Sequence, residues 1–182
     1  MIVAGAHARK LIRRFELMDA NGNGYLERED YALLSRRLIE EFAGSAGPAK
    51  ANAVLDTYLR YWDEFIGHMD RDGDGRVTKG EFVQAISAKT IDAAGFDRVA
   101  EPHFRAVCEL ADTDGDGSVN RAEFIRVMSV YGVGAQDAEA VFARLDSDAD
   151  GALTVGELTA AGRDFYLSDD DGSNGSGLFG PH

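Results

Sequence analysis

One segment of the sequence places three aspartates at alternating positions ahead of a glycine and a glutamate. Asp112, Asp114 and Asp116 precede Gly117, and Glu123 follows seven residues after the last aspartate. Carboxylates with this spacing can wrap one side of a hard divalent cation, while the glutamate closes the far side with both of its oxygens. Gly117 allows the sharp turn because glycine reaches positive φ at little steric cost. These residue types predict a Ca²⁺ site.

The same arrangement occurs four times and matches the twelve-residue loop of the EF-hand. The loops are residues 19–30, 70–81, 112–123 and 146–157, called here loops one to four. Positions 1, 3, 5 and 12 supply side-chain oxygens, and position 7 supplies a backbone carbonyl. The predicted metal ligands are therefore Asp19, Asn21, Asn23, Tyr25 and Asp30; Asp70, Asp72, Asp74, Arg76 and Glu81; Asp112, Asp114, Asp116, Ser118 and Glu123; and Asp146, Asp148, Asp150, Ala152 and Glu157.

Loop one departs from the other three. It has asparagine at positions 3 and 5, and Asp30 at position 12 is one methylene shorter than the usual glutamate. A shorter carboxylate reaches the ion less easily with both oxygens, so we expect this loop to bind Ca²⁺ more weakly or to tolerate the smaller Mg²⁺. Glu27 at position 9 is a candidate compensating ligand. We still expect a metal ion here.

The chain is strongly acidic, with 32 acidic and 19 basic residues and a formal net charge of −13. The acid is concentrated in the loops, which favours cations as partners and argues against nucleic acid, because nucleic acid requires a basic face. Cys108 is the only cysteine, so no internal disulfide can form, and no apolar run approaches the length of a membrane span. We expect a soluble, cytoplasmic monomer without membrane association.

Apolar residues recur at helical spacing on both sides of each loop, which predicts an all-α fold of four EF-hands. Because one hand cannot bury its apolar stripe alone, the hands are expected to form two pairs within a compact globule. Leu26 with Val77, and Val119 with Leu153, would form short two-stranded bridges between paired loops.

The pairs define the expected domains. Residues 1–90 form an N-terminal pair and residues 91–167 a C-terminal pair, with a linker near Lys89–Pro102 that contains Gly95 and Pro102. Residues 168–182, acidic and rich in glycine and serine, are expected to be a flexible tail. The alternative is that Leu178 and Phe179 fold back into an apolar cleft.

Two other segments have alternative interpretations. The first helix carries Arg9, Lys10, Arg13 and Arg14, which we expect on a solvated face, with a surface for a partner or lipid as the alternative. The helix that enters loop two is rich in aromatic residues between 54 and 69. These are expected in the core, with a ligand cavity lined by the rings as the alternative.

The spacing of the loops carries a family resemblance. The loops start at residues 19, 70, 112 and 146, so the intervals are 51, 42 and 34 residues, unlike the regular intervals of calmodulin. The chain resembles the family of calerythrins and sarcoplasmic calcium-binding proteins in three features. These are the long first interval, the motif from Asp19 to Glu27 with Asp30 at position 12, and the segment Gly162–Tyr166. The resemblance implies a compact globule that buffers calcium or signals with it in the cytosol. Members of that family often have a degraded second loop, whereas loop two is complete here.

Three classes of function follow from these observations. The favoured one is an intracellular calcium buffer or transporter with metal in three or four sites. The alternative is a sensor that exposes an apolar surface on binding Ca²⁺ and regulates a protein target, although apart from Met1 only Met18, Met69 and Met128 could form a methionine-rich surface. Enzymatic activity is not expected. Photoproteins share the loop spacing, but Trp62 is the only tryptophan, and His7, His68, His103 and His182 form no recognisable constellation.

Overall fold

The computed structural model describes residues 6–45, 47–88, 92–168, 170 and 172–180. The predicted boundary between the two pairs, after residue 90, lies outside these ranges, as do residues 1–5 and 181–182. Within the described ranges, no helix is both long and apolar enough to cross a membrane.

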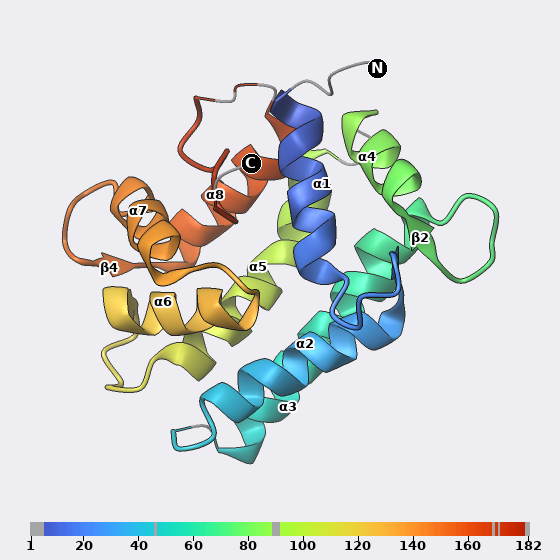
Figure 1. Cartoon of the computed structure of the whole chain (residues 1–182). Helices are drawn as coiled ribbons and strands as arrows, with labels where there is room; N and C mark the ends of the chain where they lie inside the picture. The colour runs from blue at the N-terminus through green and yellow to red at the C-terminus, as the bar shows by residue number, and fades with distance from the viewer. Residues whose placement is uncertain (1–5, 46, 89–91, 169, 171, 181–182) are drawn as a thin grey trace.

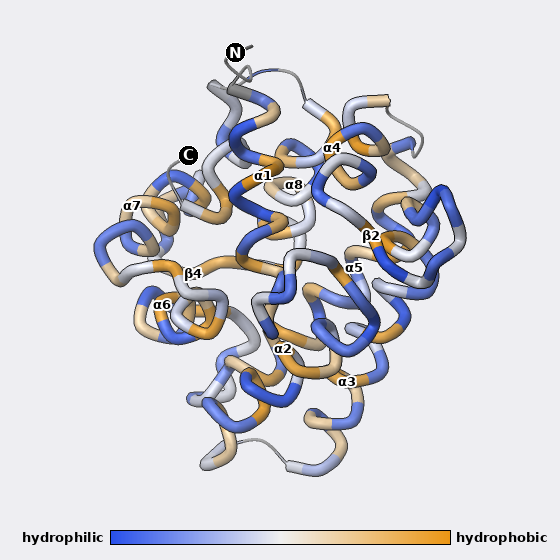
Figure 2. Tube along the Cα trace, turned by 45° about the vertical axis from the view of Figure 1, so that its right-hand side comes forward, coloured by the Kyte–Doolittle hydropathy of each residue, from blue (hydrophilic) through white to orange (hydrophobic). Residues whose placement is uncertain are grey.

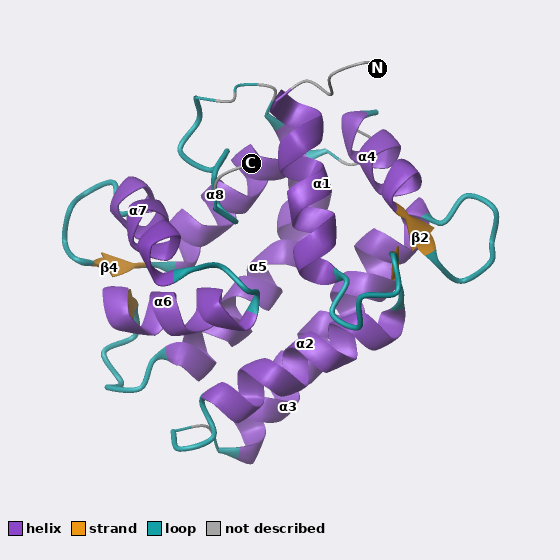
Figure 3. Cartoon of the chain, viewed as in Figure 1, coloured by secondary structure: helices purple, strands orange, loops and turns teal. Residues whose placement is uncertain are grey.

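Helices flank each of the four loops, and Figures 1 and 3 show the mainly helical architecture with short strands that the sequence predicts. The N-terminal pair contains α1 (Ala6–Met18), β1 (Tyr25–Leu26), α2 (Arg28–Glu41), α3 (Pro48–Tyr61), β2 (Val77–Thr78) and α4 (Lys79–Ser87). The C-terminal pair contains α5 (Ala93–Ala111), β3 (Val119–Asn120), α6 (Arg121–Val130), α7 (Ala135–Leu145), β4 (Ala152–Leu153) and α8 (Val155–Leu167).

The helix that enters loop two changes its winding before the loop begins. α3 is followed by a π-helical turn, Trp62–Ile66, and a 3₁₀ turn, Gly67–Met69. The buried ring of Trp62 lies 5.6 Å, between centroids, from the ring of Tyr31 on α2. The aromatic residues of this helix are thus packed largely in the core, as expected.

The loops pair through the predicted strands. β1 and β2 are antiparallel with Leu26 opposite Val77, and β3 and β4 are antiparallel with Val119 opposite Leu153. All four side chains are buried, which confirms the predicted bridges. Loops two and four project from opposite sides of the molecule and are hydrophilic in Figure 2.

The two pairs share one core. The hydroxyls of Tyr58 on α3 and Tyr131 after α6 are hydrogen-bonded to each other. The Arg126 Nε on α6 donates to the Glu41 carboxylate on α2 at 2.9 Å. Apolar side chains of both pairs belong to the same buried cluster, so each pair completes the core of the other.

The predicted linker is wrong for residues 93–102, because α5 runs through them with Pro102 inside the helix. The Asp92 carboxylate caps the helix by accepting the Gly95 N–H at 2.7 Å. Phe96 and Val99 are buried, so packing against the core outweighs the local preference against helix at Gly95 and Pro102. Cys108 is buried in the same helix, and burial raises the pKa of its thiol to about 12.

The expectation of a free tail also requires correction. Leu178 and Phe179 are only 3% and 7% exposed. The Phe179 ring meets the Phe165 ring of α8 edge to face, with centroids 5.0 Å apart. The alternative, in which these two residues fold back into an apolar cleft, is the arrangement observed, because burying the two apolar side chains is favourable.

The fold of the tail changes the environment of the basic cluster on α1. Lys10 and Arg14 were expected in solvent but are 1% and 5% exposed. The Lys10 Nζ donates to the Ser168 carbonyl at 3.2 Å, and the Arg14 Nε donates to the Tyr166 hydroxyl at 2.9 Å. These groups are buried because α8 and the segment that follows it cover this side of α1.

Candidate calcium sites

Loops two, three and four each gather three carboxylates around a common point. In each loop, one oxygen from each of three residues lies within 4.8 Å of the other two. Hard oxygen donors with negative charge are the ligands that Ca²⁺ prefers, so the donor sets fit that ion. The sets are Asp70, Asp72 and Glu81; Asp112, Asp114 and Glu123; and Asp146, Asp148 and Asp150. The other predicted carboxylates, Asp74, Asp116 and Glu157, belong to the same loops but lie outside these sets.

The glutamate at position 12 joins the two ends of its loop through backbone hydrogen bonds. The two oxygens of Glu123 accept the N–H groups of Thr113 at 2.7 Å and Asn120 at 3.0 Å. Glu81 and Glu157 accept the equivalent N–H groups in loops two and four. Hydrogen bonds from the Thr78 side chain and backbone lower the pKa of Glu81, so this carboxylate is ionised at neutral pH.

The backbone turns sharply at positions 4 and 6 of the loops. Position 6 is glycine in all four loops, with φ of 88° at Gly117 as an example. Position 4 is glycine in loops one to three, but in loop four it is Ala149, with φ of 58°. A side chain in this region costs roughly 1–2 kcal/mol. The turn predicted from the sequence was at position 6 alone, although the recurrent glycine at position 4 is a sequence signal for this second turn.

Loop one is built differently at position 12. The Asp30 carboxylate is fully buried and accepts three backbone N–H groups, from Glu27 at 2.8 Å, Ala20 at 3.1 Å and Asn21 at 3.2 Å. Burial raises the pKa of Asp30 and outweighs these hydrogen bonds. The short side chain is therefore held against the backbone of its own loop, and among the described residues loop one forms no cluster of three carboxylates.

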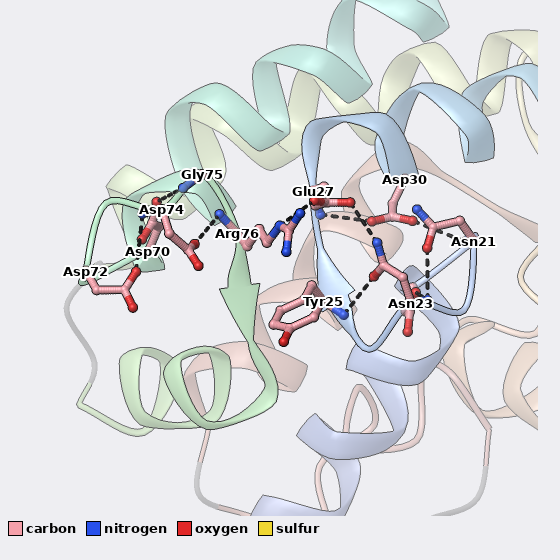
Figure 4. Close-up of polar contacts among 11 residues, drawn as sticks. Asn21, Asn23, Tyr25, Glu27, Asp30, Asp70, Asp72, Asp74, Gly75 and Arg76 are labelled. Carbon is pink, nitrogen blue, oxygen red and sulfur yellow. Dashed lines mark hydrogen bonds and ion pairs between the residues drawn. The ribbon is translucent and has the colours of Figure 1, made fainter.

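An arginine of loop two reaches into loop one (Figure 4). The Arg76 Nε forms an ion pair with Glu27 Oε1 at 2.9 Å, and its guanidinium lies 5.2 Å from the centroid of the Tyr25 ring. The other Glu27 oxygen accepts the Asn23 side-chain amide at 2.7 Å. The loop pattern predicts only a backbone carbonyl ligand from Arg76. The side-chain contact was not predicted, because it depends on how the two loops pair.

Comparison with known proteins agrees with this geometry. The family model for an EF-hand domain pair matches residues 8–87 and again residues 67–129. Calerythrin from Saccharopolyspora erythraea is 28% identical over 160 residues, which cover 87% of this chain and 90% of calerythrin.

Solved structures give the same result. The structure of a Streptomyces coelicolor calcium-binding protein, described as the basis for prokaryotic calcium-mediated regulation, matches with a TM-score of 0.79 and 31% identity over 90% of this chain and 99% of that one. The calcium-loaded coelenterazine-binding protein from Renilla muelleri shares the fold, with a TM-score of 0.71 and 21% identity over 99% and 100% of the two chains. The chain belongs to the EF-hand family of calcium-binding proteins and is of the calerythrin and sarcoplasmic calcium-binding type.

Proposed function

We propose that the protein is an intracellular calcium buffer or carrier, active as a monomer and without enzymatic activity. It would bind Ca²⁺ at loops two, three and four through the ligands that the sequence predicts. Loop one would bind Ca²⁺ weakly or hold Mg²⁺. The observation that carries this proposal is the difference in carboxylates between the loops: loops two, three and four each gather three of them around one point, whereas loop one, with Asn21 and Asn23 at positions 3 and 5, gathers no such set among the described residues.

The electrostatics of the loops explain why cations would stabilise the fold. Two like charges about 4 Å apart repel by about 1 kcal/mol in water and by more where they are partly buried. A bound divalent cation removes this repulsion, and an ion that binds only the folded state raises stability by mass action. A large rise in melting temperature with Ca²⁺, reversed by a chelator, is expected.

The packing supports a buffer rather than a sensor. Met18, Met69 and Met128 are all buried, so the described surface offers no methionine-rich groove. The two pairs complete one core, which leaves each pair little freedom to open independently.

A sensor is the second candidate function. The structural match to the Streptomyces coelicolor protein, whose description refers to calcium-mediated regulation, favours it. In that case Ca²⁺ would open an apolar surface for a protein target.

Two measurements on the metal-free protein separate these functions. Calorimetric titration with Ca²⁺ at millimolar Mg²⁺ should show three strong sites. Retention on a phenyl column should be the same with Ca²⁺ as with chelator if the protein is a buffer. Calcium-dependent retention would favour the sensor, and the absence of any calcium binding would contradict both.

Substitution at position 12 tests the assignment of the ligands. Glu123→Gln should weaken binding at loop three by roughly 100-fold, because even groups that only support a metal ligand contribute 10- to 100-fold. Glu109→Gln is the matched control, since Glu109 is exposed on the helix that enters the same loop. Equal effects of the two substitutions would show that general charge, not coordination, decides the affinity.

A further inference from the structure

Arg14 is a buried cation that has no counter-charge within the described part of the chain. Its guanidinium is nearly inaccessible, its Nε donates to the Tyr166 hydroxyl, and its Nη1 has no hydrogen-bond partner among the described residues. No described carboxylate forms an ion pair with it. A buried charge left unpaired is costly, which is why such groups normally have partners.

The surrounding rings do not supply negative charge. Arg14 lies among the hydroxyls of Tyr31, Tyr61, Tyr131 and Tyr166. Burial raises the pKa of Tyr31 and Tyr61 well above the ordinary value, and it also raises the pKa of Tyr131. The hydroxyls of Tyr31, Tyr61 and Tyr131 are therefore neutral at physiological pH, and none of these three supplies a negative charge to Arg14.

A second unpaired group lies in the same cavity. His103 on α5 is 7% exposed, and its Nδ1 also has no hydrogen-bond partner among the described residues. Arg14 and His103 both line a cavity of about 50 Å³ between α1, α5, α6 and α8. Most of the remaining lining is apolar and includes Val107, Met128 and Leu158. The cavity thus has a polar end, formed by these two side chains, and an apolar body.

The tail closes this cavity. Leu178 and Phe179 line it, and the Phe179 ring centroid lies 3.7 Å from the Arg14 guanidinium carbon. The tail is closely seated, because a Cβ on Gly175 would lie 2.2 Å from the Ala161 carbonyl oxygen on α8. The volume as it stands is well below the roughly 150 Å³ of an apolar cavity that admits benzene. A larger guest would therefore have to displace Phe179.

We propose that this cavity is a binding site for a small organic anion with an apolar body. The carboxylate or sulfonate head of the ligand would accept hydrogen bonds from Arg14 Nη1 and pair with its charge, and His103 would provide the second polar contact. The apolar body would lie along α5, α6 and α8 in the space that the Phe179 ring fills. Residues 172–180 would serve as the lid.

The test uses the full chain saturated with Ca²⁺ and two dyes that differ by one sulfonate group. Anilinonaphthalene sulfonate carries the anionic head, and phenylnaphthylamine is its uncharged parent. The wild-type protein should bind one sulfonate dye and prefer it to the neutral one. Arg14→Met should weaken sulfonate binding by about 10- to 100-fold, the size of a lost hydrogen bond to a charged group, and leave neutral-dye binding unchanged. Arg9→Met, which removes an exposed charge from the same helix, is the matched control.

Two further measurements separate a ligand site from a structural role. Phe179→Ala should tighten sulfonate binding, because it removes the ring that occupies the space, and the preference for the anion should remain. The melting temperature of ligand-free Arg14→Met should equal or exceed that of wild type, because the variant no longer buries an unpaired charge. The proposal is overturned by equal affinity for the two dyes in the wild-type and Phe179→Ala proteins, or by equal effects of Arg14→Met and Arg9→Met. A lower melting temperature of Arg14→Met with an unchanged dye preference would also overturn it.

Discussion

Arg76 and Glu27 belong to different calcium loops, yet the arginine Nε and the glutamate Oε1 lie 2.9 Å apart. The pair spans the β1–β2 bridge, beside Tyr25 (Figure 4). It places a positive charge of loop two against the carboxylate at position 9 of loop one. The electrostatic environments of the two metal sites are therefore not independent. A residue of loop two partly neutralises the negative charge of loop one.

Replacing Arg76 should strengthen metal binding by the N-terminal pair. Arg76→Gln removes the cation that neutralises Glu27, so the calcium affinity of loops one and two should rise by about 2- to 5-fold at low salt, as expected for a partly exposed pair. The gain should shrink as salt screens the charges. Calorimetry at two ionic strengths measures it. Arg28→Gln, which breaks an exposed pair with Asp63 instead, is the control of equal charge, and an equal gain there would show that net charge alone is responsible.

Lengthening the carboxylate at position 12 of loop one should have opposite effects with and without metal. Asp30→Glu should tighten calcium binding at this loop by about 10-fold, because glutamate is the usual bidentate ligand at this position. The metal-free protein should lose about 1–3 kcal/mol of stability, since an extra methylene enters a fully buried site. Melting with and without Ca²⁺ measures both effects. Asp56→Glu, at an exposed position, should change neither, and unchanged or weaker binding in Asp30→Glu would refute the argument from carboxylate length.

Replacing Ala149 with glycine should stabilise the protein. Its φ of 58° is unfavourable for alanine, so Ala149→Gly should raise the free energy of unfolding by about 1 kcal/mol. Ala160→Gly, at an exposed position inside α8, should lower it by a similar amount because glycine disfavours helix. Denaturant unfolding of the metal-free variants measures the change in the free energy of unfolding for both substitutions. Destabilisation by both would show that the backbone at position 149 is not strained.

His103 should make the fold sensitive to mild acid. Burial, with a smaller contribution from the nearby Arg14 charge, lowers the pKa of His103 to about 3, so the imidazole is neutral in the folded state. The unfolded chain takes up a proton below the ordinary pKa of about 6.5, so this contribution to stability is complete above that pH and is lost as the pH falls toward 3. Between about pH 7 and pH 5 the loss should be about 2 kcal/mol.

Removal of the imidazole tests this dependence. His103→Gln should flatten the dependence of unfolding free energy on pH in that range, whereas His68→Gln, at an exposed position, should not. A steep loss of stability that persists in His103→Gln would assign the acid sensitivity to the carboxylates of the loops.

The sequence was sufficient to predict the parts of the molecule that local chemistry decides. The loop residues predicted the positions of the turns, and the apolar residue at position 8 predicted which side chains face each other in the bridges, as Leu26 and Val77 do. Each of these features depends on residues within one short segment or on a repeated pairing rule.

The features that the sequence did not reveal depend on contacts between distant segments. Pro102 indicated a linker, but packing of α5 in the core holds it in a helix. The polarity of residues 168–176 indicated a free tail, but two apolar residues beyond them are enough to anchor it on α8 and α1. Arginine usually lies at the surface, and Arg14 is buried only because the tail packs against α8 and α1.

The position of Trp62 makes it an intrinsic fluorescent probe of the N-terminal pair. It is the only tryptophan, it is buried in the π-helical turn before loop two, and its ring lies close to Tyr31 on the helix that leaves loop one. The fluorescence of Trp62 should therefore change when the N-terminal pair rearranges and change little when loops three and four bind ions. A titration read from this one ring would separate the filling of the two halves without any added label.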